Sequence, residues 1–99
     1  MPRLLTDEEI SRQLAELPDW SRAARAITAG FKLPSFRAAL ALVQEVGDIA
    51  EEMDHHPDID VRYDQVTLSV FTHSAGGLTQ LDIELAHRIS AAARVLQSG

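Results

Sequence analysis

The spacing of the hydrophobic residues changes from helical to alternating and back again along the chain, which predicts helices separated by strands. The first helical segment follows Thr6, which has the spacing of a capping box with Glu9, and it should end before Pro18. Residues 34–54 form the clearest helical segment, and the last helix should begin at Thr79. The apolar positions that mark the middle helix are Phe36, Ala39, Leu40, Val43, Val46, Ala50 and Met53.

Two segments in which apolar and polar residues alternate predict two β-hairpins. The first hairpin should turn at residues 23–24 and continue as a strand over about 25–33. The second should pair strands over 59–63 and 66–70 through a turn at 64–65. Strands that come in hairpin pairs form an antiparallel sheet.

The order of elements is therefore α-β-β-α-β-β-α. It predicts an α+β fold of two layers, a four-stranded antiparallel sheet with three helices on one face. The length of 99 residues and the hydrophobic content of 45% fit one domain, 1–99, with one core. Four short strands leave two open edges, so we expect the chain to form a homo-oligomer through them.

Composition argues against several classes of function. The net charge is -6, which argues against a nucleic-acid partner, because such partners are bound largely by Lys and Arg. The chain has no cysteine, so it has no disulfide, no thiolate nucleophile and no cysteine-type zinc site. No apolar run approaches membrane-spanning length, and the start of the chain lacks the features of a secretory signal. We expect a cytoplasmic protein with no membrane partner.

Two adjacent histidines, His55 and His56, follow the middle helix and precede Pro57. Glu51 lies four residues before His55, so the two side chains should share a helix face, where the carboxylate can hold the imidazole ring. A histidine held in this way suits a general acid near neutral pH. For either histidine taken alone, a polar residue that closes a helix is the simpler interpretation.

Three more residues could belong to a site. His73 lies at a strand end before glycines that let a ligand approach the backbone, although a solvated histidine is the simpler interpretation. Asp82 has capping-box spacing to Thr79, yet it shares an apolar stripe that would aim it inward, where it could orient an imidazole. Both interpretations of Asp82 remain open. Trp20, the only tryptophan, is either a core residue or a flat wall for a planar ligand.

These residues together resemble the signature of a known family. After Glu51 come three residues, His55-His56-Pro57, five residues, Tyr63, nine residues, His73, eight residues and Asp82. This pattern is similar to that of the pterin-4a-carbinolamine dehydratases. The resemblance also covers Asp19-Trp20, Phe31, Phe36 and the segment 72–86, and so extends over most of the chain.

One position departs from the family pattern. The family usually has Arg or Lys immediately before the aspartate, and this chain has Leu81 there. The departure concerns a basic contact at the edge of the site and leaves the three histidines intact.

The resemblance implies the same fold, assembly as a homodimer or homotetramer, and a dehydratase activity. The reaction would convert 4a-hydroxytetrahydrobiopterin to quinonoid dihydropterin, which recycles the cofactor of aromatic amino acid hydroxylases. The expected partners are therefore the pterin substrate and a functionally linked hydroxylase, and neither a metal nor a cofactor is expected. The expected catalytic residues are His55, His56, His73, Glu51 and Asp82, and the expected substrate-binding residues are His56, Pro57 and Trp20.

Within this set we expect His55 and His73 to form an acid–base pair, because histidine suits both proton transfers at neutral pH. In this hypothesis Glu51 tunes His55, and Asp82 orients His73 or the pterin ring.

Two alternatives stay open. Three histidines with nearby carboxylates could bind zinc, although the adjacent His55 and His56 should point apart, which makes joint coordination awkward. The fold could instead serve as a non-enzymatic dimerisation or binding module, in which the histidines would be incidental.

Overall fold

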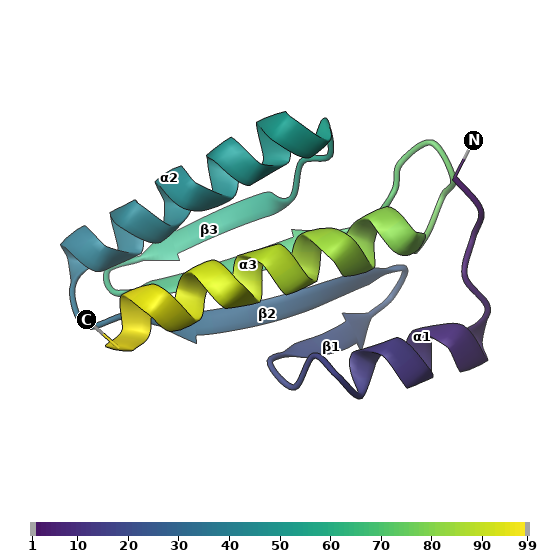
Figure 1. Cartoon of the computed structure of the whole chain (residues 1–99), viewed down its shortest axis with the longest axis horizontal. Coiled ribbons are helices and arrows are strands. Elements are labelled where there is room, and N and C mark those ends of the chain that lie inside the picture. Colours follow the sequence, from purple (N-terminus) through teal and green to yellow (C-terminus); the bar gives the residue numbers. More distant parts are fainter. Residues whose placement is uncertain (1, 99) are drawn as a thin grey trace.

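The computed structural model describes residues 2–98 and has the predicted order of helices and strands, so the α+β fold class is confirmed (Figure 1). The helices are α1 (Asp7–Leu14), α2 (Phe36–Met53) and α3 (Gln80–Ser98), and the strands are β1 (Trp20–Ala23), β2 (Ala26–Lys32), β3 (Asp58–Arg62) and β4 (Gln65–Val70). No helix within residues 2–98 has both the length and the apolar character that crossing a membrane requires.

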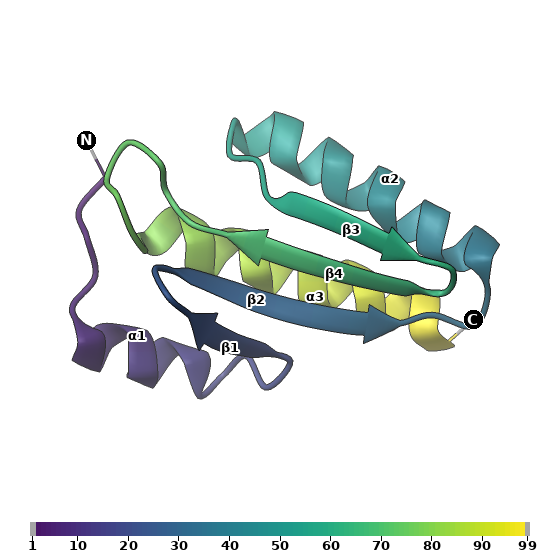
Figure 2. The same cartoon turned by 180° about the vertical axis from the view of Figure 1, so that it is seen from behind.

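The four strands form one antiparallel sheet in the order β1-β2-β4-β3, so the pairing of β2 with β4 joins the two hairpins. Helices α2 and α3 lie side by side across one face of this sheet, and residues 2–98 place no helix across the opposite face (Figures 1 and 2). Val66 and Leu68 of β4 are buried under the helices, whereas Thr67 between them is exposed. Helix α1 lies near the β1 edge and adds Ile10 to the same core.

Both hairpin turns differ from the prediction by one residue. The registers pair Ala23 with Ala26 and Arg62 with Gln65, so the turns lie at 24–25 and 63–64. The first residue of each turn, Ala24 or Tyr63, has a positive φ, of 54° and 52°. Two-residue hairpin turns need such a conformation and usually obtain it from glycine or asparagine. Because alanine and tyrosine stand there instead, the sequence lacked the signal that would have placed the turns.

The helix starts were predicted more accurately than the buried face of α2. Thr6 caps α1 through the predicted capping box with Glu9, and Ser35 caps α2 by accepting from the Ala38 N–H. The stripe predicted for α2 was partly wrong, because Phe36 and Leu40 are exposed while Leu42 is buried. An apolar second face of α2 therefore remains uncovered within the described chain.

Trp20 lies in the core, and the N–H of its ring is hydrogen-bonded there. Its ring packs edge-on against Phe31, with centroids 6.4 Å apart, and its Nε1–H donates to Ser90 Oγ over 2.8 Å.

Ser90→Ala is expected to lower the free energy of unfolding by about 1–3 kcal/mol, because the buried Trp20 N–H would lose its acceptor. Urea unfolding followed by Trp20 fluorescence measures this loss. Ser11→Ala, at an exposed position of α1, is the control, and an equal loss in both variants would contradict the prediction.

Candidate active site

The candidate site lies where the end of α2 meets the loop between β4 and α3. Helix α2 stops at Asp54, whose φ of 52° places it in the left-handed region, and the next backbone N–H, of His55, donates to the Ala50 carbonyl over 3.0 Å. A residue in the left-handed conformation is a common end for a helix. Asp54 also sends His55 inward, where 9% of the residue is exposed, while His56 stays exposed.

Asp82, in the first turn of α3, is the centre of a buried hydrogen-bond network. Its Oδ1 lies 2.6 Å from His55 Nε2. Its Oδ2 accepts hydrogen bonds from the Thr72 hydroxyl and from the Thr79 backbone N–H, each at 2.8 Å. A fully buried carboxylate is costly to desolvate unless its oxygens are paired, and here both oxygens are. Asp82 therefore fills both roles that its sequence position left open, since it caps a helix and holds an imidazole.

The directions of the hydrogen bonds determine which nitrogen of His55 is available. The Thr72 and Thr79 hydroxyl oxygens are 2.7 Å apart, and Thr79 donates in this pair because Thr72 gives its single proton to Asp82. The Thr72 hydroxyl and the Thr79 N–H both donate to Asp82, which acts as an acceptor toward them. The contact with His55 then has its proton between Oδ1 and Nε2, donated by the imidazole. Within residues 2–98 no buried side-chain nitrogen lacks a hydrogen bond. Nδ1 of His55 forms no hydrogen bond with these residues, so it is accessible from the adjoining space.

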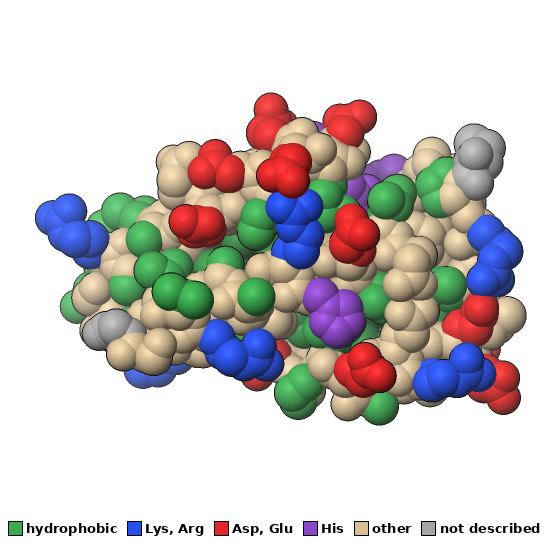
Figure 3. All heavy atoms as spheres, viewed as in Figure 1, with side chains coloured by type: hydrophobic (Ala, Val, Ile, Leu, Met, Phe, Trp, Pro, Cys, Tyr) green, Lys and Arg blue, Asp and Glu red, His purple; other side chains and the backbone are tan. Residues whose placement is uncertain are grey.

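That space is an open cavity of about 470 Å³, within the usual range for small-molecule sites. The cavity brings together segments that are far apart in the sequence, those after α2 and after β4, and Pro2 and Leu81 also line it. Histidine side chains gather on this part of the surface, beside the end of α2 (Figure 3). The lining includes His55, His56, Pro57, Thr72 and His73.

His73 lies beyond the end of β4 and is exposed. Its ring packs against Phe71, with centroids 4.1 Å apart. The Arg25 guanidinium lies 4.9 Å from the centre of the same Phe71 ring. Contacts with an aromatic ring, rather than with a carboxylate, therefore position His73.

The predicted pairing of Glu51 with His55 is wrong. Glu51 Oε2 lies 2.5 Å from His56 Nε2 instead. The prediction assumed that the helix continues to His55, whereas the left-handed Asp54 breaks the spacing of four residues on which it rested. Both partners of the Glu51–His56 pair are exposed, so the pair stabilises the fold by no more than about 1 kcal/mol.

Two other expectations also need correction. Asp82 bonds to His55 rather than to His73, because its side chain points under the loop while His73 points out of it. Trp20 was expected to bind substrate, but it is 5% exposed, donates to Ser90 and does not line the cavity. Its place on the helix-facing side of β1 makes it a core residue.

Thr72 is the functional residue that sequence reasoning missed. Successive residues in extended backbone point to opposite sides, so an outward His73 implies an inward Thr72. A buried hydroxyl needs a partner, and a carboxylate nearby in the fold is a strong one. The sequence thus contained the signal, although only the structure shows that the carboxylate is that of Asp82.

Within residues 2–98, no three histidine, aspartate or glutamate side chains are arranged to hold a metal ion. The Nε2 atoms of His55 and His56 are bonded to two different carboxylates, those of Asp82 and Glu51. The geometry thus gives the zinc alternative no support.

Comparisons with known proteins find relatives that match over most of the chain. A protein from Nocardia farcinica is 50% identical over 92% of this chain and 96% of its own length, and one from Chloroflexus aurantiacus is 51% identical over 90% and 95%. Both are provisionally named pterin-4-alpha-carbinolamine dehydratase. The crystal structure of a transcriptional coactivator/pterin dehydratase from Brucella melitensis matches with a TM-score of 0.89 and 34% identity, over 92% of this chain and 99% of that one.

A more distant structure shares the fold alone. It is a pterin dehydratase-like protein identified as a RuBisCO assembly factor in the alpha-carboxysome, with a TM-score of 0.62 and 19% identity over 75% of this chain and 86% of that one. The family model described as pterin 4 alpha carbinolamine dehydratase matches residues 3–92, which is most of the chain. This match, together with relatives at about half identity, shows that the chain belongs to the pterin 4 alpha carbinolamine dehydratase family.

Proposed function

We infer that this chain dehydrates a 4a-hydroxytetrahydropterin to a quinonoid dihydropterin. The observation that carries the inference is the buried Asp82–His55 pair, which holds one imidazole nitrogen and turns the other toward a cavity that His73 also lines. A carboxylate that fixes the orientation of a histidine is a common arrangement for general acid–base catalysis.

The chemistry needs one proton delivered and one removed. The substrate is a hemiaminal, so its hydroxyl leaves as water when a proton reaches the oxygen and the C–O bond breaks. The electron pair of the adjacent ring nitrogen forms the new C=N bond, and a ring nitrogen then loses a proton. His55 Nδ1 and the exposed His73 ring line the same cavity, so they are placed to share these two transfers. Neither step requires a redox change.

His56 and Pro57 supply binding in this proposal. Glu51 fixes the exposed His56 ring from the last turn of α2, and Pro57 gives the cavity a rigid apolar wall. Glu51 therefore acts on substrate binding through His56, and not on His55.

The chain would act after an aromatic amino acid hydroxylase, which forms the carbinolamine. We further propose that it works as a homodimer or homotetramer in the cytoplasm.

A dehydration assay tests the proposal. A phenylalanine hydroxylase generates the carbinolamine, and its ultraviolet absorbance is followed with and without this protein. We expect a faster decay with the protein, and the same rate with His87→Ala, which removes an exposed histidine of α3 that does not line the cavity. If the folded protein does not accelerate the decay, the proposal is wrong. The non-enzymatic binding module, consistent with the description of the Brucella protein as a transcriptional coactivator, would then be preferred.

A further inference from the structure

Thr72 is bonded toward both of the histidines to which the proposed function gives the proton transfers. It is 3% exposed, so its polar groups depend on partners within the protein. Its side chain is bonded to the carboxylate that holds His55, and its backbone is bonded across the loop that carries His73. These two sets of contacts have different partners.

The backbone of Thr72 closes the loop that carries His73. Its N–H donates to the Gly77 carbonyl over 2.9 Å, and its own carbonyl accepts from the N–H groups of Gly76 and Gly77 at 2.9 and 3.3 Å. Gly76 has a φ of 75°, a left-handed conformation that glycine adopts without strain. His73 therefore follows a fixed point of the backbone and lies within a closed loop.

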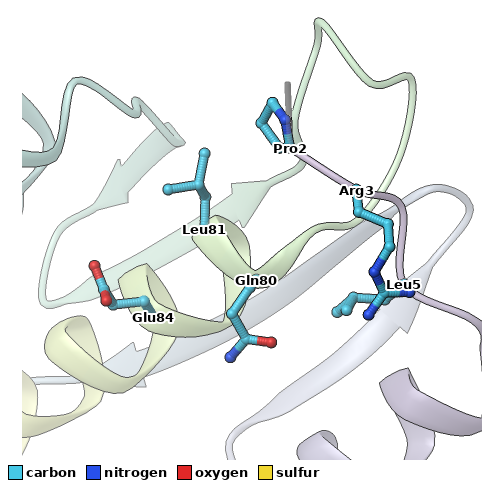
Figure 4. Close-up of a pocket in the computed structure, with 6 residues that line it drawn as sticks. All are labelled: Pro2, Arg3, Leu5, Gln80, Leu81 and Glu84. Carbon is cyan, nitrogen blue, oxygen red and sulfur yellow. The ribbon is translucent and has the colours of Figure 1, made fainter.

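The N-terminal segment also holds this loop, beside which it runs (Figure 4). The Leu5 N–H donates to the Leu78 carbonyl over 2.9 Å. A Cβ at Gly77 would lie 3.0 Å from Leu4 Cδ2, so glycine permits this close packing. The end of the loop that is bonded to Thr72 is thus held by a second part of the chain.

The hydroxyl of Thr72 lies in the middle of a directed chain of hydrogen bonds. The Leu81 N–H donates to Thr79 Oγ1 at 3.3 Å, and the Thr79 hydroxyl donates to Thr72 Oγ1 at 2.7 Å. Thr72 in turn donates to Asp82 Oδ2 at 2.8 Å, and the other oxygen of Asp82 faces His55. A hydroxyl that accepts a hydrogen bond becomes a better donor, so this order strengthens the bond that orients the carboxylate.

We propose that Thr72 is a positioning residue of the dehydration, which holds the His55 imidazole and the loop of His73 at one fixed spacing across the cavity. The proposal rests on the function proposed above, in which the two imidazoles share the proton transfers. Such transfers are sensitive to geometry, since a displacement of about 1 Å can lower a rate about a hundredfold. The Thr72 hydroxyl acts on this geometry through Asp82 and is not offered to the substrate.

Thr72→Val removes the hydroxyl and keeps the shape of the side chain. It is expected to lower kcat by about 10- to 100-fold and to change KM by less than about twofold, because His56 and Pro57 are unaffected. Thr72→Ser keeps the hydroxyl and should retain kcat within about threefold of the wild type. The carbinolamine assay described above measures both constants.

Two further variants make the comparison specific. Thr28→Val is the matched control, because the Thr28 hydroxyl donates to the Leu68 carbonyl over 2.9 Å and does not line the cavity, so kcat should stay unchanged. Thr79→Val removes the donor to Thr72 but leaves the bond from Thr72 to Asp82. Its kcat should therefore lie between those of the wild type and Thr72→Val.

Nuclear magnetic resonance of the protein labelled with ¹⁵N-histidine gives a readout that does not depend on turnover. His55 is buried and the other three histidines are exposed, so the slowly exchanging imidazole proton should be that of His55 Nε2. Thr72→Val should accelerate its exchange with water by about tenfold or more, because the carboxylate is no longer held in one orientation. Thr72→Ser and Thr28→Val should keep the slow exchange.

The outcomes separate this proposal from the proposed function. Full kcat in Thr72→Val, or an equal fall of kcat in Thr28→Val, would show that Thr72 does not position the site. A lower kcat with unchanged exchange of the His55 proton would also contradict the proposal, because the hydroxyl would then not act through Asp82. If the wild type does not accelerate dehydration while the proton responds to Thr72→Val as expected, the proposed function is wrong and the hold of Thr72 on His55 stands.

Discussion

Asp82→Asn is expected to lower kcat for dehydration by about 10²- to 10⁴-fold, the usual contribution of a positioned acid–base group. All three neighbours of the Asp82 carboxylate donate hydrogen bonds to it, and an asparagine must turn its own NH₂ donor toward one side. If the NH₂ faces His55 Nε2, the histidine must carry its proton on Nδ1. This is the nitrogen that faces the cavity, and it could then no longer accept a proton there. If it faces Thr72 and Thr79, buried donors meet a donor, and the fold loses about 1–3 kcal/mol for each unsatisfied group.

Kinetics and urea unfolding of the same preparation distinguish the two orientations. The first orientation lowers kcat with little loss of stability, and the second lowers both. Asp48→Asn is the matched control, because this exposed aspartate of α2 keeps an oxygen for its Gln44 partner after the exchange. An Asp82→Asn variant with the full rate would contradict the role given to the buried pair.

His73→Ala is expected to lower kcat by a similar factor, about 10²- to 10⁴-fold, and to leave the free energy of unfolding within about 0.5 kcal/mol of the wild type. His73 is exposed and held by ring contacts with Phe71, so its removal leaves no buried group without a partner. His55→Ala should instead lower both quantities, with a stability loss of about 3 kcal/mol or more, because Asp82 would stay buried without its partner.

Measuring kcat and unfolding for both alanine variants checks this contrast between the histidines. A stability loss in His73→Ala as large as that in His55→Ala would mean that the two side chains do not play different structural roles. Full activity in the alanine variants of His55, His56 and His73 would rule out histidine acid–base catalysis altogether.

The fold was predictable from local rules because most of its elements obey them. Thr6 and Glu9 form the capping box that their spacing indicated, and the alternation in β4 buries Val66 and Leu68 as expected. The turns were not predictable to the residue, because Tyr63 adopts a positive φ that its side chain disfavours. In such a case pairing across the sheet determines the conformation, and no local sequence signal shows it.

At the site, too, local sequence spacing identified candidate residues, whereas their pairing depends on contacts between distant parts of the chain. Sequence spacing identified His55 and Asp82 as candidates and indicated the contact of Asp82 with Thr79, but it did not pair His55 and Asp82 with each other. The pairing with Glu51 failed at Asp54, because a helix end in the left-handed conformation redirects every following side chain. The Asp82–His55 bond joins residues 27 apart in the sequence, and only the packing of α2 against α3 brings them together.

The double role of Asp82 has an evolutionary consequence. A helix cap alone would tolerate glutamate or glutamine at this position, since either can reach back to the backbone N–H of the capping residue. The additional bond to His55 requires the shorter carboxylate, with one oxygen for the cap and the other for the imidazole. In a descendant that had lost the reaction, selection for the cap would persist while selection for the imidazole partner would relax. The residue at this position should then drift toward longer side chains before α3 itself is lost, so it would record the loss of catalysis while the fold is still intact.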